Sequence, residues 1–216
     1  LAVQGPKSFK LMEEVFGKEI TKLKFFKFDF FNFKNNKYLI SRSGFSKQSG
    51  YEIHIDNIEA GLTLYDYFFD IGNKYNLKPG APNHAERIEG GLLSYGNDIL
   101  ITDNPFECGF ENFVHLDSNI EFLGKKSLKN IKNKGITRKL MGVKIDTNEL
   151  SLSNTELLDI KNQVIGELRS AAFSPKFNKI VGISMIRKEF CKVAHKFKIK
   201  INKKLVSGEV VNLPIE

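Results

Sequence analysis

A polar loop bounded by two glycines, between two apolar strands, constrains this chain more than any other feature. Residues 38–40 form a short apolar strand, the loop follows, and residues 51–55 return to a strand. Gly44 and Gly50 permit the close backbone approach or positive φ that a tight ligand-binding loop requires. Glu52 lies among apolar strand residues, and its carboxylate must face solvent or hold a partner, because burying it unpaired is costly. The pattern predicts a binding loop; an ordinary hairpin with a surface glutamate is the alternative.

A second motif is a helix expected over residues 83–93, which read NHAERIEGGLL and are followed by SYGND. Asn83 and Arg87 are four residues apart and therefore share a helix face. The pair Gly90–Gly91 lowers helix stability, which indicates that another part of the chain packs closely against this backbone. Two interpretations of Arg87 and Glu89 stay open: a buried ion-pair network that fixes the helix, or direct contact with a ligand.

The length and charge of the chain exclude several classes of function. Its 216 residues allow one large or two small domains, and no apolar run approaches the ~18 residues of a membrane span. The net charge is +8, but only five of the 33 basic residues are arginine, and the lysines are scattered. Because arginine is the residue that grips phosphates and base edges with paired bonds, no nucleic-acid partner is expected.

The cysteines indicate a cellular compartment for this chain, and its first residues indicate whether it is a fragment. Cys108 and Cys191 are far apart, without CxxC spacing, and the four histidines are dispersed. This indicates ordinary thiols in a reduced, cytoplasmic protein, with no metal site. The chain begins Leu1-Ala2-Val3, which is typical of a strand from the middle of a protein, so we expect a fragment of a longer polypeptide.

The periodicity of apolar residues predicts an α+β fold that changes character near residue 136. Before that point we expect a hairpin over residues 23–42 and helices over 7–16, 58–75, 83–93 and about 125–134. After it, short strands recur at 140–145, 164–168, 180–186, 194–201 and 205–211, which indicates a small antiparallel barrel or sandwich.

The segment 23–33 is rich in phenylalanine interleaved with lysine. Alternation holds across Phe26, Phe28 and Phe30 and slips by one residue at Phe31, which predicts a bulge or a turn onto a second face. Such a pattern resembles a base-stacking surface, but the strand period explains it without a ligand. We therefore expect these rings to pack in the core.

Together the two motifs resemble the folate-dependent aminomethyltransferase (glycine-cleavage T-protein) superfamily. Residues 42–53 are similar to its R-[ST]-G-[FY]-[ST]-x₃-G-[FY]-E-I loop, and residues 87–96 to its R-x-E-x-G-x-x-x-Y-G segment. Further matches lie at 104–109, 122–125 and 166–175. The resemblance implies part of a folate-binding domain over residues 1–135, an antiparallel sheet with helices, and a C-terminal antiparallel β-barrel over residues 136–216.

The resemblance also implies a tetrahydrofolate site and its residues. Glu52 corresponds to the ligand-binding glutamate of the superfamily and Phe45 to a residue that lines the folate site. Asn83 stands where the glycine-cleavage enzymes carry a ligand-binding arginine, which puts in doubt a substrate that needs that guanidinium. The catalytic residues are expected in an N-terminal part of the polypeptide, so this chain alone should be inactive. The expected cofactor-binding residues are Glu52, Tyr51, Phe45, Arg42, Asn83 and Arg87.

Within the superfamily the chain is most similar to the dimethylsulfoniopropionate demethylase branch, on residues 1–8, 42–44, 46–48, 86–98 and 104–109. This implies methyl transfer from a small sulfonium substrate to N5 of tetrahydrofolate. Because a sulfonium is already a good leaving group, positioning and exclusion of water suffice for catalysis. The alternatives are an aminomethyltransferase of the glycine cleavage system, a non-catalytic folate-binding module of the same fold, and an RNA-binding protein driven by lysine charge.

Overall fold

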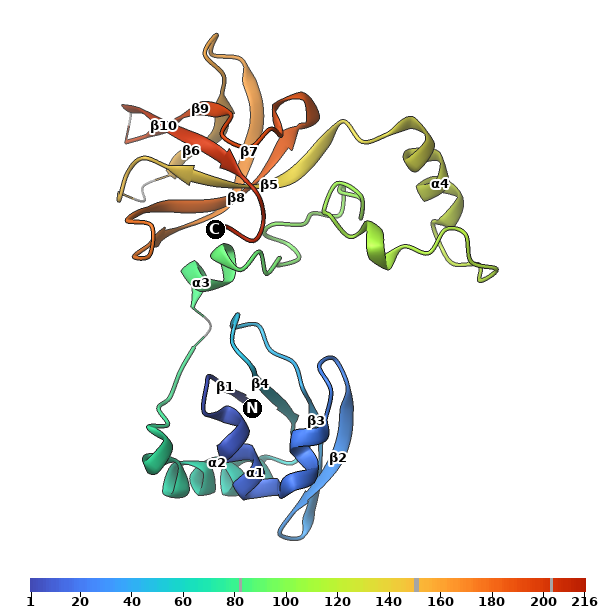
Figure 1. Cartoon of the computed structure of the whole chain (residues 1–216), viewed down its shortest axis with the longest axis vertical. Helices are drawn as coiled ribbons and strands as arrows, with labels where there is room; N and C mark the ends of the chain where they lie inside the picture. Colours follow the sequence, from blue (N-terminus) through green and yellow to red (C-terminus); the bar gives the residue numbers. More distant parts are fainter. Residues whose placement is uncertain (82, 150–151, 203) are drawn as a thin grey trace. The chain divides into compact units, whose positions relative to one another are not determined.

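The computed structural model describes residues 1–81, 83–149, 152–202 and 204–216. The chain forms two compact units, Leu1–Asn83 and His84–Glu216, which are described separately (Figure 1). Among the described residues, no helix is both long enough and apolar enough to cross a membrane.

The first unit is a four-stranded antiparallel sheet with helices packed on it. Its strands are β1 (Ala2–Gln4), β2 (Phe28–Phe33), β3 (Asn36–Ser41) and β4 (Gly50–His54), in the spatial order β1-β4-β3-β2. The helices are α1 (Ser8–Phe16) and α2 (Ile58–Gly72), with short 3₁₀ turns at Lys18–Lys22 and Asn73–Tyr75. As the turn chemistry predicts, the Asn57 side chain caps α2 by accepting from the amide of Ala60 at 2.9 Å.

One face of this sheet carries the core of the unit. Val3, Tyr38, Ile40, Tyr51 and Ile53 are buried there in a cluster with apolar residues of both helices, namely Leu11, Met12, Ala60, Leu64 and Phe68. Because successive strand residues point to opposite faces, the residues between these belong to the other face. No helix described in this unit covers that second face, and it holds the candidate site.

The phenylalanine-rich segment departs from its expected role. β2 begins only at Phe28, after a turn in which Phe26 has a φ of 58°. Phe33 is buried and Phe31 is partly buried, as expected, but Phe26, Phe28 and Phe30 are exposed by 75, 64 and 51%. Core packing was therefore the wrong prediction for these three rings. The strand period places Phe28 and Phe30 on the open face, and Phe26 lies in the turn before the strand.

The second unit is built on a closed six-stranded antiparallel barrel. Its strands run in the spatial order β10-β5-β8-β7-β6-β9, which confirms the α+β class with a C-terminal barrel. They are β5 (Arg138–Ile145), β6 (Leu152–Leu158), β7 (Val164–Ser174), β8 (Lys179–Arg187), β9 (Lys196–Ile201) and β10 (Lys204–Val211). β6 was not predicted, and β7 is longer than the periodicity indicated.

The helices of this unit are α3 (His84–Glu89) and α4 (Lys125–Lys134), and 3₁₀ turns lie at Glu111–Phe113 and Lys188–Phe190. Ile88 of α3 packs with Leu140, Ile183 and Met185 of β5 and β8. The helix predicted over 83–93 is shorter than expected because Gly91 has a φ of +64°, which a right-handed helix does not allow. The domain boundary expected near residue 136 stays a prediction. The first barrel strand, β5, begins at Arg138.

Candidate functional site

The loop between β3 and β4 is closed by the two glycines and by Gln4. Neither Gly44 nor Gly50 has a positive φ. A Cβ atom on Gly44 would lie 2.2 Å from Gln4 Oε1, and one on Gly50 would lie 2.3 Å from the carbonyl oxygen of Val3. Gly50 therefore requires glycine for close approach to backbone, one of the two roles that the sequence predicted, whereas a side chain at Gly44 would have to displace the end of the Gln4 side chain.

Gln4 of β1 connects the two ends of this loop. Its Nε2 donates to the carbonyl oxygens of Ser43 at 3.0 Å and Tyr51 at 3.1 Å, and its Oε1 accepts from Ser46 Oγ at 2.8 Å. The side chain of Gln4 thus holds the start of the loop, the middle of the loop and the start of β4. Gln4 lies within residues 1–8, which resemble the demethylase branch, but the sequence assigned it no role at this loop, because its contact with Ser43 spans 39 residues and leaves no local signal.

Glu52 lies on β4, is half-buried, and belongs to the open face of the sheet. Its Oε2 accepts a short hydrogen bond from Ser43 Oγ, and Ser43 Oγ in turn lies 2.8 Å from Ser41 Oγ. Glu52 Oε1 makes no hydrogen bond among the described residues. The carboxylate is thus oriented by a serine pair, with one oxygen left for a ligand.

Aromatic side chains continue the same face beside Glu52. In the strand register Glu52 pairs with Ser41, and Ser41 pairs with Phe28; the adjacent row pairs His54 with Leu39 and Leu39 with Phe30. Paired residues point to the same side of a sheet. The open face therefore carries a carboxylate, two serine hydroxyls and the exposed rings of Phe28 and Phe30. Phe45, in the loop, is 40% exposed.

Tyr51 and Arg42, two of the expected ligand residues, have structural partners in the first unit. Tyr51 is fully buried; its hydroxyl donates to the carbonyl oxygen of Ile20 at 3.3 Å and its ring contacts Phe9 edge-on. The Arg42 guanidinium lies 4.7 Å from the centroid of the Phe9 ring, and Nη1 donates to Leu23 O at 3.1 Å. In this structure both residues hold the strand and loop that present Glu52.

Arg87 is the centre of a buried network in the second unit. Its side chain is 4% exposed and forms an ion pair with Asp98, whose side chain is fully buried, at 2.5 Å between Nη1 and Oδ2. Nη2 donates to Ser170 Oγ at 2.9 Å, Nη1 to Leu92 O at 3.3 Å, and Nε to His84 Nδ1 at 3.2 Å. All three nitrogens have protein partners, which agrees with the interpretation of Arg87 as a framework residue.

Glu89 is buried in the same unit and does not appear as the partner of Arg87. Its Oε1 accepts from Ser174 Oγ at 2.7 Å, and its carbonyl oxygen accepts from the amide of Ile215 at 2.7 Å. These bonds tie α3 to β7 and to the end of the chain. Asn83, just before α3, is exposed. Of the expected site residues, Arg42, Phe45, Tyr51, Glu52 and Asn83 belong to the first unit and Arg87 to the second.

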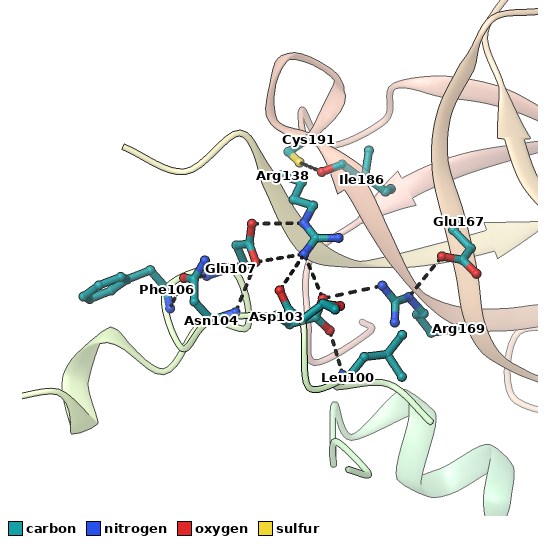
Figure 2. Close-up of polar contacts among 11 residues, drawn as sticks. Leu100, Asp103, Asn104, Phe106, Glu107, Arg138, Glu167, Arg169, Ile186 and Cys191 are labelled. Atoms are coloured by element: carbon teal, nitrogen blue, oxygen red, sulfur yellow. Dashed lines mark hydrogen bonds and ion pairs between the residues drawn. The ribbon is translucent and has the colours of Figure 1, made fainter. Parts of the chain in front are cut away.

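A second ion-pair network, not predicted from the sequence, joins the segment after α3 to the barrel (Figure 2). The side chain of Asp103 is fully buried, and its Oδ1 lies 3.0 Å from Arg138 Nη2 and 3.6 Å from Arg169 Nη2. Glu107 Oε1 accepts from Arg138 Nε at 3.0 Å. Nearby, Cys108 is buried, and this burial raises the pKa of its thiol to about 11.

Comparison with curated proteins finds relatives that are longer than this chain. It is 35% identical over 186 residues to a dimethylsulfoniopropionate demethylase from Ruegeria pomeroyi, which covers 86% of this chain and 50% of the relative. It is 31% identical over 215 residues to an aminomethyltransferase from Thermoanaerobacter pseudethanolicus, covering 98% of this chain and 58% of the relative. The chain therefore spans between half and three fifths of the length of these relatives.

A solved structure of an aminomethyltransferase has the same fold. The crystal structure of the glycine cleavage system aminomethyltransferase T from Bartonella henselae superposes with a TM-score of 0.82 at 22% identity, over 99% of this chain and 58% of that one. Residues 1–118 match the model of the GCVT N-terminal domain, and residues 138–215 match that of the glycine cleavage T-protein C-terminal barrel domain. The chain belongs to the glycine cleavage T-protein family of folate-dependent one-carbon transferases.

Proposed function

We propose that this chain is part of a tetrahydrofolate-dependent methyltransferase that demethylates dimethylsulfoniopropionate. The observation that carries the proposal is the open face of the first sheet. There one carboxylate oxygen of Glu52 has no hydrogen-bond partner within the described part of the chain, and exposed aromatic rings lie on the same face. One-carbon transfer with folate is inferred from membership of the family. The identity of the methyl donor is what we propose here.

The residues of this face fit the pterin ring of tetrahydrofolate. A pterin has an edge with an amino group and a ring N–H, and a carboxylate can accept from both in a two-point contact. Ser43 fixes the orientation of Glu52 before a ligand arrives, which lowers the entropy lost on binding. Phe28, Phe30 and Phe45 supply apolar surface for a flat ring. Tyr51, Arg42 and Gln4 would affect folate binding indirectly, by holding Glu52 in place.

The proposed reaction needs no acid or base from this chain. Tetrahydrofolate supplies the N5 lone pair that takes the methyl group, the S–CH₃ bond breaks toward sulfur, and 3-methylthiopropionate leaves. The methylated N5 then releases its proton to water, which gives 5-methyltetrahydrofolate. The role of the sheet face is to hold the acceptor in line and exclude water. A sulfonium cation is also attracted to the face of an aromatic ring, which Phe45 can present. Residues outside this chain would complete the site.

Two observations favour the demethylase over a glycine cleavage aminomethyltransferase. The Ruegeria pomeroyi relative is 35% identical, against 30–31% for the aminomethyltransferases compared. The resemblance also implies that Asn83 stands where the glycine-cleavage enzymes carry an arginine. The aminomethyltransferase stays the second candidate, since those relatives match nearly the whole chain.

The test uses a polypeptide as long as the relatives that contains these 216 residues. It is incubated with tetrahydrofolate and dimethylsulfoniopropionate, and 5-methyltetrahydrofolate is measured by chromatography. Product that depends on both substrates supports the proposal. Folate binding without product, under conditions where the Ruegeria pomeroyi enzyme turns over, would leave only a folate-binding module. The isolated chain should give no product, because we expect part of the site to come from an N-terminal part of the polypeptide.

A further inference from the structure

The open face of the first sheet extends beyond Glu52 toward the turn that joins β2 and β3 (Figure 1). Two further rows of paired residues lie on this face in that direction: Leu39 with Phe30, and then Lys37 with Asn32. The last row, which carries two polar side chains, lies beyond the pterin contact proposed at Glu52.

Lys37 presents a cation on this face. The residue is exposed, and within the described part of the chain no acidic side chain forms an ion pair with it. Its Nζ lies 4.8 Å from the centroid of the Phe30 ring, which attracts the ammonium group and keeps it over the sheet. Asn32, directly opposite in the register, is exposed as well. An ammonium and an amide that lie side by side can both donate to a carboxylate.

Between Glu52 and Lys37 the face is apolar, with a ring on each side. Leu39 is half-buried, and its register partners are His54 on β4 and Phe30 on β2. Both partners are exposed, and all three side chains point to the open face. A flat aromatic group that lies over Leu39 would therefore contact a ring at either edge.

Strand geometry gives the spacing between the two polar ends of this face. Glu52 is in register with Ser41, and Lys37 is four residues away from Ser41 on β3. Four strand residues span about 14 Å, and the step between neighbouring strands adds about 4.8 Å sideways, so the two Cα atoms are roughly 15 Å apart. By ordinary bond lengths, an extended folate spans roughly the same distance from its pterin amino group to its glutamate.

We propose that the open face binds folate along its whole length, with the glutamate carboxylates on Lys37 and Asn32 and the p-aminobenzoyl ring over Leu39. The face carries an anion, then apolar surface, then a cation. Folate carries the complementary groups in the same order: a ring edge that donates hydrogen bonds, a benzoyl ring and a dianionic glutamate. The inference rests on the pterin contact proposed at Glu52. Because each end of the face repels or leaves unpaired the wrong end of folate, the two ends together fix its direction.

The experiment compares tetrahydrofolate with the methylamide of tetrahydropteroate, in which a methyl group replaces the glutamate. Binding of each ligand to the polypeptide of full family length is measured by isothermal titration calorimetry in the absence of oxygen. We expect tetrahydrofolate to bind about tenfold more tightly, because only its carboxylates can accept charge-assisted hydrogen bonds from Lys37. Equal affinity for the two ligands would overturn the proposal.

Variants locate the glutamate contact. Lys37→Gln should weaken tetrahydrofolate binding about tenfold and leave binding of the methylamide unchanged, whereas Lys37→Arg should keep most of the preference. Asn32→Asp places a carboxylate beside the glutamate and should have the same selective effect as Lys37→Gln. The control is Lys10→Gln, which removes an exposed lysine from α1, on the opposite side of the sheet, and should bind both ligands like the parent.

The two ends of the face are tested separately. Glu52→Gln should weaken both ligands alike, because both contain the pterin. If Lys37→Gln weakens both ligands equally, or neither of them, the assignment of the glutamate contact is wrong. If the parent binds neither ligand, or Glu52→Gln changes nothing, the pterin contact is wrong and this inference falls with it. Failure of methyl transfer while these binding differences hold would contradict only the proposed methyl donor.

Discussion

Glu52 and Phe28 stand in one row of the first sheet, because both are in register with Ser41 on the strand between them. Two strand spacings separate them, roughly 10 Å. Both side chains point to the face that lacks a covering helix, and Phe28 is 64% exposed there. A flat ring that bonds to Glu52 at one edge would therefore lie over Ser41 and reach toward an aromatic side chain.

Glu52→Gln should weaken tetrahydrofolate binding by about tenfold or more, because hydrogen bonds to a charged acceptor contribute about 1.5–3 kcal/mol. The measurement is isothermal titration calorimetry on the polypeptide of full family length. Glu19→Gln removes a charge from an exposed 3₁₀ turn and should bind folate like the parent. If the two variants bind alike, Glu52 is a surface glutamate of an ordinary hairpin.

Phe28 and Phe33 lie on the same strand and should respond differently to truncation. Phe33→Ala removes a ring that is 8% exposed and should lower the free energy of unfolding by about 3–5 kcal/mol. Phe28→Ala should change it by less than about 0.5 kcal/mol while weakening folate binding. Urea denaturation measures the first effect and calorimetry the second. A large loss of stability from Phe28→Ala would show that the open face is packed.

These two phenylalanines also show where prediction from the sequence ends. The period of two correctly identified a strand with two faces, but it could not say which face is covered. That depends on α1 and α2, which come from sequence positions on either side and pack on Phe33, Tyr38 and Ile40. The turn at Phe26, with its positive φ, was visible only as a slip in the alternation.

Arg87→Met should destabilise the second unit by about 3–5 kcal/mol, because it leaves the fully buried Asp98 carboxylate without its counter-charge. Thermal unfolding followed by circular dichroism tests this. Arg87→Met combined with Asp98→Leu removes both charges and should recover part of the loss. A ligand-binding Arg87 would instead leave the stability of the free protein nearly unchanged.

The sequence identified the motif around Arg87, but it could not identify the residues that bond to the Arg87 side chain. Its partners Asp98 and Ser170 are 11 and 83 residues away, and only the packing of α3 on β7 brings Ser170 to the guanidinium. The same holds for Asp103 between Arg138 and Arg169. Local spacing reveals side chains that share a face, whereas long-range pairs require the barrel topology.

Cys108 should resist alkylation in the native chain. Burial raises the pKa of its thiol to about 11, so at pH 8 only about one molecule in a thousand carries the reactive thiolate. Iodoacetamide labelling at pH 8, read by mass spectrometry, should leave Cys108 unmodified until urea unfolds the chain. Rapid labelling under native conditions would show that the contact between this segment and the barrel opens.

The most direct test of the account is methyl transfer itself. A polypeptide of full family length that contains this chain is incubated with tetrahydrofolate and dimethylsulfoniopropionate labelled in its S-methyl groups. The account predicts labelled 5-methyltetrahydrofolate and 3-methylthiopropionate in equal amounts, with the rate strongly reduced by Glu52→Gln and unaffected by Glu19→Gln. No label on folate, or equal rates for the two variants, would contradict it.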